Sequence, residues 1–211
     1  MIADRKWSEA CNVRNRRTTK TRTIIMTHWM QEIQNEVGQW SEANFGDPEN
    51  APADMPLIGA GEEIGELTTS VLKRRQGIDD SEKYEDIVGP EAEKDAIGDI
   101  TIYMLDAVHR MPYDADVSRT FETQRLNEAG YYADDEDDIS TIREIYRTYA
   151  KVSDLEICTD NEKDFHIEYA VGTFFAVLNE FCVLRGYDYE QCVRDAWIEV
   201  SDRKWDADVE R

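Results

Sequence analysis

GEEIGELTTSVLKRRQG, at residues 61–77, places its apolar side chains three and four residues apart. This is the spacing of one face of an α-helix, so the stretch predicts a helix with a single buried side. Gly77 follows the last apolar turn, a position at which glycine commonly ends a helix. The predicted buried stripe consists of Ile64, Leu67, Val71 and Leu72.

Helical spacing recurs on both sides of this stretch, and no segment alternates with a period of two. The predicted fold class is therefore an all-α helical bundle. Proline suits the first turn of a helix and cannot continue a helix interior, so Pro90 and Pro112 bound one of these elements. The further helices are predicted from Thr27 to about Gly46, from about Pro90 to Arg110, from Ser140 through Val152, from about Asp164 to Leu184, and from Tyr189 through Val200.

The sequence from Pro112 to about residue 138 is polar and includes the acidic run DDEDD at residues 134–138. This composition predicts a solvated insertion with at most short helical turns. We find no internal repeat of useful length.

The chain is predicted to form a single domain. Its first residues are basic and lack an apolar stripe, so they are predicted to be a flexible arm, or alternatively to lie upstream of a start codon at Met26. The predicted boundaries are 1–26 for the arm, 27–206 for the domain, about 112–160 for the insertion and 207–211 for a tail.

The composition is strongly acidic, with 46 Asp and Glu against 24 Lys and Arg in 211 residues and a formal net charge of −22. Such a charge counts against nucleic acid as the partner, because that binding depends on basic side chains, and against an anionic membrane surface. Self-repulsion on this scale is screened by salt, which indicates a halophilic cytoplasm; the alternative is an ordinary acidic, soluble protein.

Four cysteines are scattered without a CxxC pair, which fits neither a zinc knuckle nor a disulfide-rich secreted module. No apolar run approaches the length of a membrane span. These features predict reduced thiols and a cytoplasmic protein.

Two groups of carboxylates lie within apolar parts of two predicted helices. Glu63 and Glu66 are three residues apart with Glu62 beside them, so they share a helical face. Asp95 and Asp99 are four residues apart and also share a face. Ionised carboxylates among apolar neighbours need compensation, and if the two faces meet, their oxygens suit Mg²⁺ or Mn²⁺. In a chain this acidic, the alternative is a chance pairing on solvated faces.

Lys73 lies seven residues after Glu66, close to two turns along the same predicted helix. Its charge could meet a phosphate-bearing substrate, or it could serve only to complement the helix C-terminus.

These motifs resemble those of the MazG-like family of all-α nucleoside triphosphate pyrophosphohydrolases. The resemblance covers about residues 27–110 and 165–206. It rests on GEEIGEL at 61–67, VLKR at 71–74, GI at 77–78, DAIGDI at 95–100 and IY at 102–103, with Trp40, NFG at 44–46, GYDYE at 186–190, Trp197 and RKW at 203–205.

The resemblance implies Mg²⁺-dependent hydrolysis of an NTP or dNTP between its α and β phosphates, giving the monophosphate and pyrophosphate. The family's EExxE motif is present as Glu62, Glu63 and Glu66. This implies that Glu63 and Glu66 are metal ligands, and that Glu62 or Glu66 orients or deprotonates the attacking water.

The family's second motif, ExxD, is only partly present. Asp99 matches the aspartate, whereas Ala96 occupies the position of the glutamate. Asp95, one residue earlier, is expected to replace it as a ligand, displaced by about 100° around the helix.

Other expectations concern substrate and partners. Lys73, Arg203 and Lys204 are candidate phosphate contacts, and the last two are alternatively solvated charges. Trp40 and Phe45 are expected to pack in the core, with stacking on a base as the alternative. The expected partners are a nucleoside triphosphate and a second copy of the chain, in a homodimer or homotetramer, with no nucleic acid and no membrane.

Two alternative functions stay open. One is hydrolysis of phosphoribosyl-ATP, which uses a related fold. The other is a non-catalytic helical nucleotide-binding or interaction protein, which Ala96 in place of the motif glutamate would allow.

Overall fold

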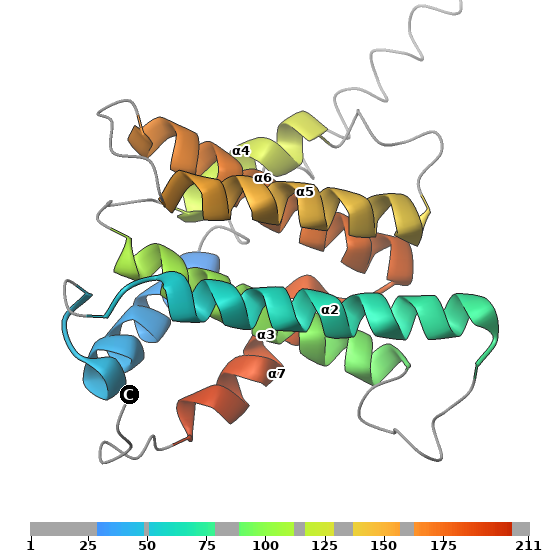
Figure 1. Cartoon of the computed structure of the whole chain (residues 1–211), viewed down its shortest axis with the longest axis horizontal. Coiled ribbons are helices and arrows are strands. Elements are labelled where there is room, and N and C mark those ends of the chain that lie inside the picture. The colour runs from blue at the N-terminus through green and yellow to red at the C-terminus, as the bar shows by residue number, and fades with distance from the viewer. Residues whose placement is uncertain are drawn as a thin grey trace, which may run out of the picture.

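The computed structural model is all-helical, which confirms the predicted fold class. It describes residues 29–48, 51–78, 89–111, 117–128, 137–156 and 163–203, and these ranges contain helices and no strand. A helix over residues 29–45 comes first. The helices labelled in Figure 1 are α2 (Asp54–Gln76), α3 (Pro90–Arg110), α4 (Val117–Glu128), α5 (Asp138–Glu156), α6 (Lys163–Arg185) and α7 (Tyr189–Ser201).

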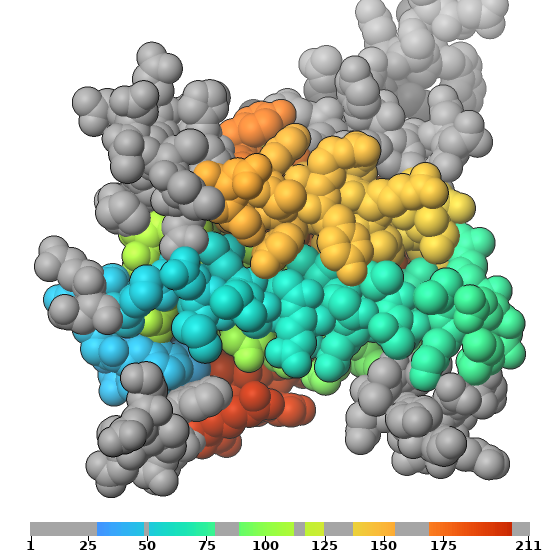
Figure 2. Space-filling model, viewed as in Figure 1, coloured from blue at the N-terminus to red at the C-terminus, as the bar shows by residue number. Residues whose placement is uncertain are grey.

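The helices form two layers, seen one above the other in Figure 1. In one layer, α2 and α7 both pack against α3. The helix over residues 29–45 belongs to this layer, because its Ser41 donates a 2.6 Å hydrogen bond to Asp106 of α3. In the other layer, α4 and α5 both pack against α6. The layers meet along α2 and α5, which run side by side on the face shown in Figure 2.

The predicted apolar stripe of α2 forms part of the core. Ile64, Leu67 and Val71 are all buried, as the spacing predicted. Leu72 is 49% exposed, so its assignment to the stripe was wrong. A step of one residue turns the side chain by about 100°, which carries Leu72 away from the buried face that ends at Val71.

Several helix ends match the sequence prediction. α3 begins at Pro90 and ends at Arg110. α2 ends before Gly77, whose φ of 67° is the left-handed conformation that glycine adopts at low cost. α5 begins slightly earlier than predicted, because the Asp137 carboxylate accepts a 2.9 Å hydrogen bond from the backbone N–H of Ser140 and caps the helix.

The region predicted to hold at most short helical turns contains α4, a helix of 12 residues. Val117 and Phe121, four residues apart, are fully buried, and α4 packs against α6. The prediction was wrong because the polar composition hid a two-residue apolar face that becomes stable only against α6.

A buried ionic network ties the layers together around Glu93, which is 0% exposed. Its carboxylate accepts hydrogen bonds from Arg74 Nε of α2 at 3.0 Å and from Arg185 Nε of α6 at 2.8 Å. The Tyr187 hydroxyl also donates to it at 2.8 Å. Arg74 reaches further to Asp138, so the end of the predicted acidic run is engaged in an ion pair.

Among the described residues, no helix combines the length and hydropathy that a membrane span requires. The predicted arm at 1–26 and the tail at 207–211 lie outside the described residues.

Candidate functional site

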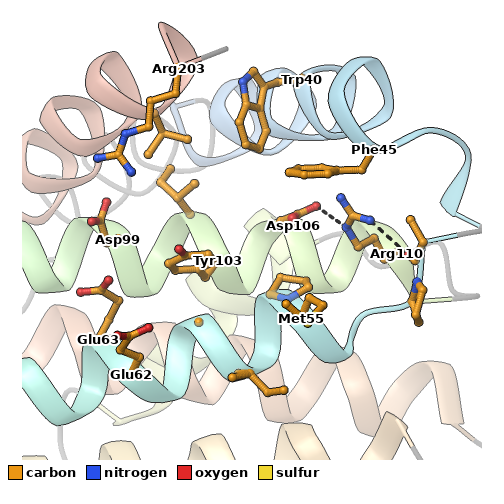
Figure 3. A pocket seen from close by; sticks show the side chains of 17 residues that line it. Trp40, Phe45, Met55, Glu62, Glu63, Asp99, Tyr103, Asp106, Arg110 and Arg203 are labelled. Atoms are coloured by element: carbon orange, nitrogen blue, oxygen red, sulfur yellow. Dashed lines mark hydrogen bonds and ion pairs between the residues drawn. The ribbon is translucent and has the colours of Figure 1, made fainter. Parts of the chain in front are cut away.

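A pocket of about 780 Å³ lies between α2, α3, the helix over residues 29–45 and the end of α7. Carboxylates gather at one end of it and aromatic side chains at the other (Figure 3). Tyr103 lies between the two ends. The pocket is lined by Trp40, Phe45, Ala51, Pro52, Met55, Pro56, Ile58, Gly59, Glu62, Glu63, Asp99, Ile102, Tyr103, Asp106, Arg110, Val200 and Arg203.

At the acidic end, Glu63 of α2 and Asp99 of α3 lie near each other and both line the pocket (Figure 3). Each is followed in sequence by a fully buried isoleucine, Ile64 and Ile100. Because adjacent helical positions are turned by about 100°, burying the isoleucines places the carboxylates at the edge of the α2–α3 contact, facing the pocket. The structure therefore brings together one residue from each of the two predicted motifs.

This end of the pocket is electrostatically unfavourable for negative charge. Burial, with Asp99 as the next cause, raises the pKa of Glu63 from 4.5 to about 8. Burial and the neighbouring Asp95 raise the pKa of Asp99 from 3.8 to about 6. Glu66 adds to both shifts. Burial and neighbouring carboxylates therefore disfavour the ionised form of both groups.

The remaining predicted acidic residues surround this pair. Glu62 lines the pocket beside Glu63. Glu66 and Asp95 are exposed and are not among the lining residues, although both are close enough to raise the pKa of Glu63. The structure thus separates Glu62, which faces the pocket, from Glu66, which flanks it.

The predicted basic residues have different positions. Arg203 lines the pocket, and its positive charge lowers the pKa of Asp99 against the larger effects of burial and Asp95. Lys73 lies in the last turn of α2, ten residues or about 15 Å along the helix from Glu63, and does not line this pocket. Lys204 lies outside the described residues.

The donor set at the acidic end fits a hard divalent cation. Carboxylate oxygens are the ligands that Mg²⁺ and Mn²⁺ prefer, and an ion would compensate the burial and the like charges that raise the pKa values of Glu63 and Asp99. In the described part of the chain, no three Asp, Glu, His or Cys side chains are gathered closely enough to form a metal-binding group as they stand. Ala96, at the position of the motif glutamate, has a methyl side chain that offers no ligand oxygen, and it is buried in the core.

The other end of the pocket is apolar and aromatic. Trp40 and Phe45 form an edge-to-face pair with ring centroids 5.5 Å apart. Both are only partly buried and both line the pocket, beside Met55 and Ile58, which are 72% and 64% exposed. Flat, adaptable apolar surfaces of this kind suit a planar ring system.

Sequence reasoning missed a polar group behind this aromatic end. Arg110 donates from Nε to Asp106 at 2.7 Å and from Nη2 to the Ser41 hydroxyl at 2.7 Å. The same guanidinium lies 4.8 Å from the centre of the Phe45 ring. Asp106 and Arg110 are opposite charges four residues apart within an apolar helix, a signal that could have pointed to them.

Comparison of the chain with protein-family models, with curated proteins and with solved structures finds no match. Function is therefore inferred from the geometry of the pocket together with the motifs in the sequence.

Proposed function

We propose that this protein is a metal-dependent nucleotide pyrophosphohydrolase, which cleaves an NTP or dNTP to the monophosphate and pyrophosphate. The observation that carries the proposal is the layout of one pocket: carboxylates from α2 and α3 line one end and aromatic side chains line the other. A nucleotide has a matching arrangement, with a polyphosphate that binds cations at one end and a planar base at the other.

In this proposal, Glu63 and Asp99, with Glu66 and Asp95 beside them, would hold Mg²⁺ or Mn²⁺. When bound, the cation offsets the charge of the triphosphate and polarises its phosphoryl oxygens. Arg203, at the same end of the pocket, would contact a phosphate.

Glu62 is the better placed of the two predicted residues to act on water, because it lines the pocket and Glu66 does not. Its carboxylate would orient the attacking water and accept its proton as the anhydride between the α and β phosphates is cleaved. At the other end, Trp40 and Phe45 would hold the base, in the role that the sequence left as the alternative to core packing.

The test is to incubate the purified protein with each NTP and dNTP, and with phosphoribosyl-ATP, in the presence of Mg²⁺ while pyrophosphate release is measured. We expect release from at least one nucleoside triphosphate and a loss of roughly 100-fold or more in Glu63→Gln. Glu91→Gln is the matched control, because Glu91 lies on α3 outside the pocket and its side chain is 86% exposed. Nucleotide binding without pyrophosphate release would contradict the proposal in favour of a binding protein.

A further inference from the structure

The two layers of the fold are built in the same way. In one layer, α3 is packed between α2 and α7; in the other, α6 is packed between α5 and α4 (Figure 1). We call the first the carboxylate unit and the second the companion unit. The chain crosses between them twice, because α4 follows α3 in sequence yet packs on α6, whereas α7 follows α6 and packs on α3.

The central helices of the two units also share a short sequence motif. A shift of 74 residues takes Gly98 of α3 to Gly172 of α6 and aligns AIG at 96–98 with AVG at 170–172. The same shift aligns YD at 113–114 with YD at 187–188, each just before the helix that crosses to the other unit.

The two aligned glycines occupy equivalent points of close helix packing. A Cβ added at Gly98 would lie 2.5 Å from the backbone oxygen of Cys192 and 2.5 Å from Ala196 Cβ, both on α7. A Cβ added at Gly172 would lie 2.8 Å from the backbone carbon and the Cβ of Thr120, on α4. In each unit the glycine permits the close approach of the crossing helix.

The outer helices α2 and α5 match with a shift of 81 residues, which superposes their buried faces. The aligned buried pairs are Ile64 with Ile145, Leu67 with Thr148, and Val71 with Val152. α2 and α5 pack side by side and antiparallel, as two copies related by a two-fold axis would. Thr68 of α2 bonds to the Tyr146 hydroxyl at 3.2 Å, and the Tyr149 hydroxyl donates to the Leu57 carbonyl at 2.8 Å.

The same alignment shows what became of the site in the companion unit. Glu144 takes the place of Glu63, but Arg147 takes the place of Glu66 and forms an ion pair with Glu144. Thr173 takes the place of Asp99, and its hydroxyl donates to the Tyr169 carbonyl at 2.8 Å. At the positions aligned with Glu63, Glu66 and Asp99, the companion unit therefore keeps one carboxylate, Glu144, and pairs it with Arg147.

We infer that the chain is an internal dimer: the companion unit is a second copy of the carboxylate unit that has lost its site, and its α5 occupies the surface of α2 that a second chain would otherwise cover. One chain then holds one site, with α2 supported from within the same chain. The architecture does not depend on the proposed function, whereas the fate of the site does.

A cross-linking experiment tests the architecture without reference to metal or substrate. Thr68→Cys and Tyr146→Cys are combined, with Cys11→Ser and Cys158→Ser, in the full chain and treated with a short bis-maleimide. We expect a product with the mass of one chain plus one linker joined at both ends, and no such product from control variants that carry only Thr68→Cys or only Tyr146→Cys beside the buried Cys182 and Cys192. A product of twice that mass, or no cross-link in the double variant, would overturn the inference.

A reciprocal exchange tests the loss of the site, with Mn²⁺ binding measured by equilibrium dialysis. Glu66→Arg copies the companion pairing into α2, and we expect at least a tenfold loss of Mn²⁺ affinity with a higher unfolding midpoint. Arg147→Glu with Thr173→Asp copies the carboxylates into the companion unit, and we expect additional bound Mn²⁺ per chain.

Lys151→Glu with Thr173→Asp is the matched control, because it makes the same charge change at an exposed position of α5. If Arg147→Glu with Thr173→Asp folds, as judged by circular dichroism, and binds no more Mn²⁺ than the wild type, the assignment of a lost site is overturned. If Arg147→Glu with Thr173→Asp does not fold, Glu66→Arg tests the lost site instead. An unchanged Mn²⁺ affinity in Glu66→Arg would then overturn the assignment of a lost site. Absence of Mn²⁺ binding in the wild type would contradict the proposed function and leave the cross-linking result standing.

Discussion

Glu93 and Glu63 are carboxylates on the same pair of packed helices, and their surroundings are opposite. Glu93 is fully buried, yet Arg74, Arg185 and the Tyr187 hydroxyl all donate to it. Glu63 is only partly buried, but its charged neighbours are mainly other carboxylates, and its pKa rises to about 8. A buried carboxylate with its own cations stabilises a fold, whereas one held among like charges costs stability and is suited to binding an external cation.

Removing the compensated carboxylate is expected to have the largest effect. Glu93→Ala leaves Arg74 and Arg185 without their buried acceptor, and breaking a buried ionic network from one side typically costs roughly 3–5 kcal/mol. The free energy of unfolding, measured by urea denaturation, should fall by that amount. An unchanged midpoint would show that Glu93 does not hold the layers together.

Adding a divalent cation should act on the other cluster. Ligand that binds only the folded state at 100 times its Kd stabilises by about 2.7 kcal/mol, so Mg²⁺ should raise the melting temperature of the wild type. Glu63→Gln with Asp99→Asn should abolish the increase, because it removes a pocket-lining carboxylate from each of α2 and α3. An equal increase in that double variant would place the bound ion elsewhere.

The pH dependence of stability should distinguish the two clusters further. The pKa values of Glu63 and Asp99 are raised in the folded state to about 8 and about 6, so these two groups bind more protons in the folded protein than in the unfolded chain between about pH 4 and pH 8. Without metal, this contribution to stability is complete below about pH 4 and is lost as pH rises to about 8.

Because Glu63 is partly exposed, we expect its share of that loss to be roughly 1–2 kcal/mol after discounting for solvent screening. Urea denaturation from pH 4 to pH 8 should therefore show a smaller decline in Glu63→Gln than in the wild type. A parallel decline in both proteins would mean that Glu63 ionises normally.

The smallest effect is expected at an exposed carboxylate of the same helix. Glu91 pairs with Lys94 at 2.7 Å in solvent, and such pairs contribute little to stability. Glu91→Gln should leave the urea midpoint, the Mg²⁺ response and the pH dependence within error of the wild type. A clear change in any of these measurements would show that burial does not explain why the carboxylates on these helices differ in their effects.

The prediction from sequence succeeded where local chemistry was sufficient. The bounds of α3 followed from Pro90 and Pro112, and Gly77 ended α2, because these residues restrict the backbone whatever surrounds them. Within the described residues, Glu63 and Asp99, which come from two separate motifs, line the same pocket. The prediction failed at Leu72 and at α4, where burial depends on which neighbouring helix is present.

The sequence alone did not predict a relation between the two units, because α3 and α6 have few identical residues. The shifts that align the helices also differ: 74 residues for α3 with α6, and 81 residues for α2 with α5. The correspondence emerges from packing: Gly98 and Gly172 each admit a helix that comes from the opposite unit. A helical period records which face of a segment is apolar, but it carries no information about the partner of that face.

By itself, then, the sequence determined the helical class, most of the helix ends and the two acidic motifs, because spacing and backbone restriction act over a few residues. The tertiary structure decided that Glu62 faces the pocket and Glu66 flanks it, that Lys73 lies far from the carboxylates, and that the same pocket continues to Trp40 and Phe45. It also decided which carboxylates are paired with basic side chains, as Glu93 is with Arg74 and Arg185. Those outcomes depend on residues that are distant in the chain and come into contact only when the helices pack. The spacing of residues along the chain does not specify which distant residues will be in contact.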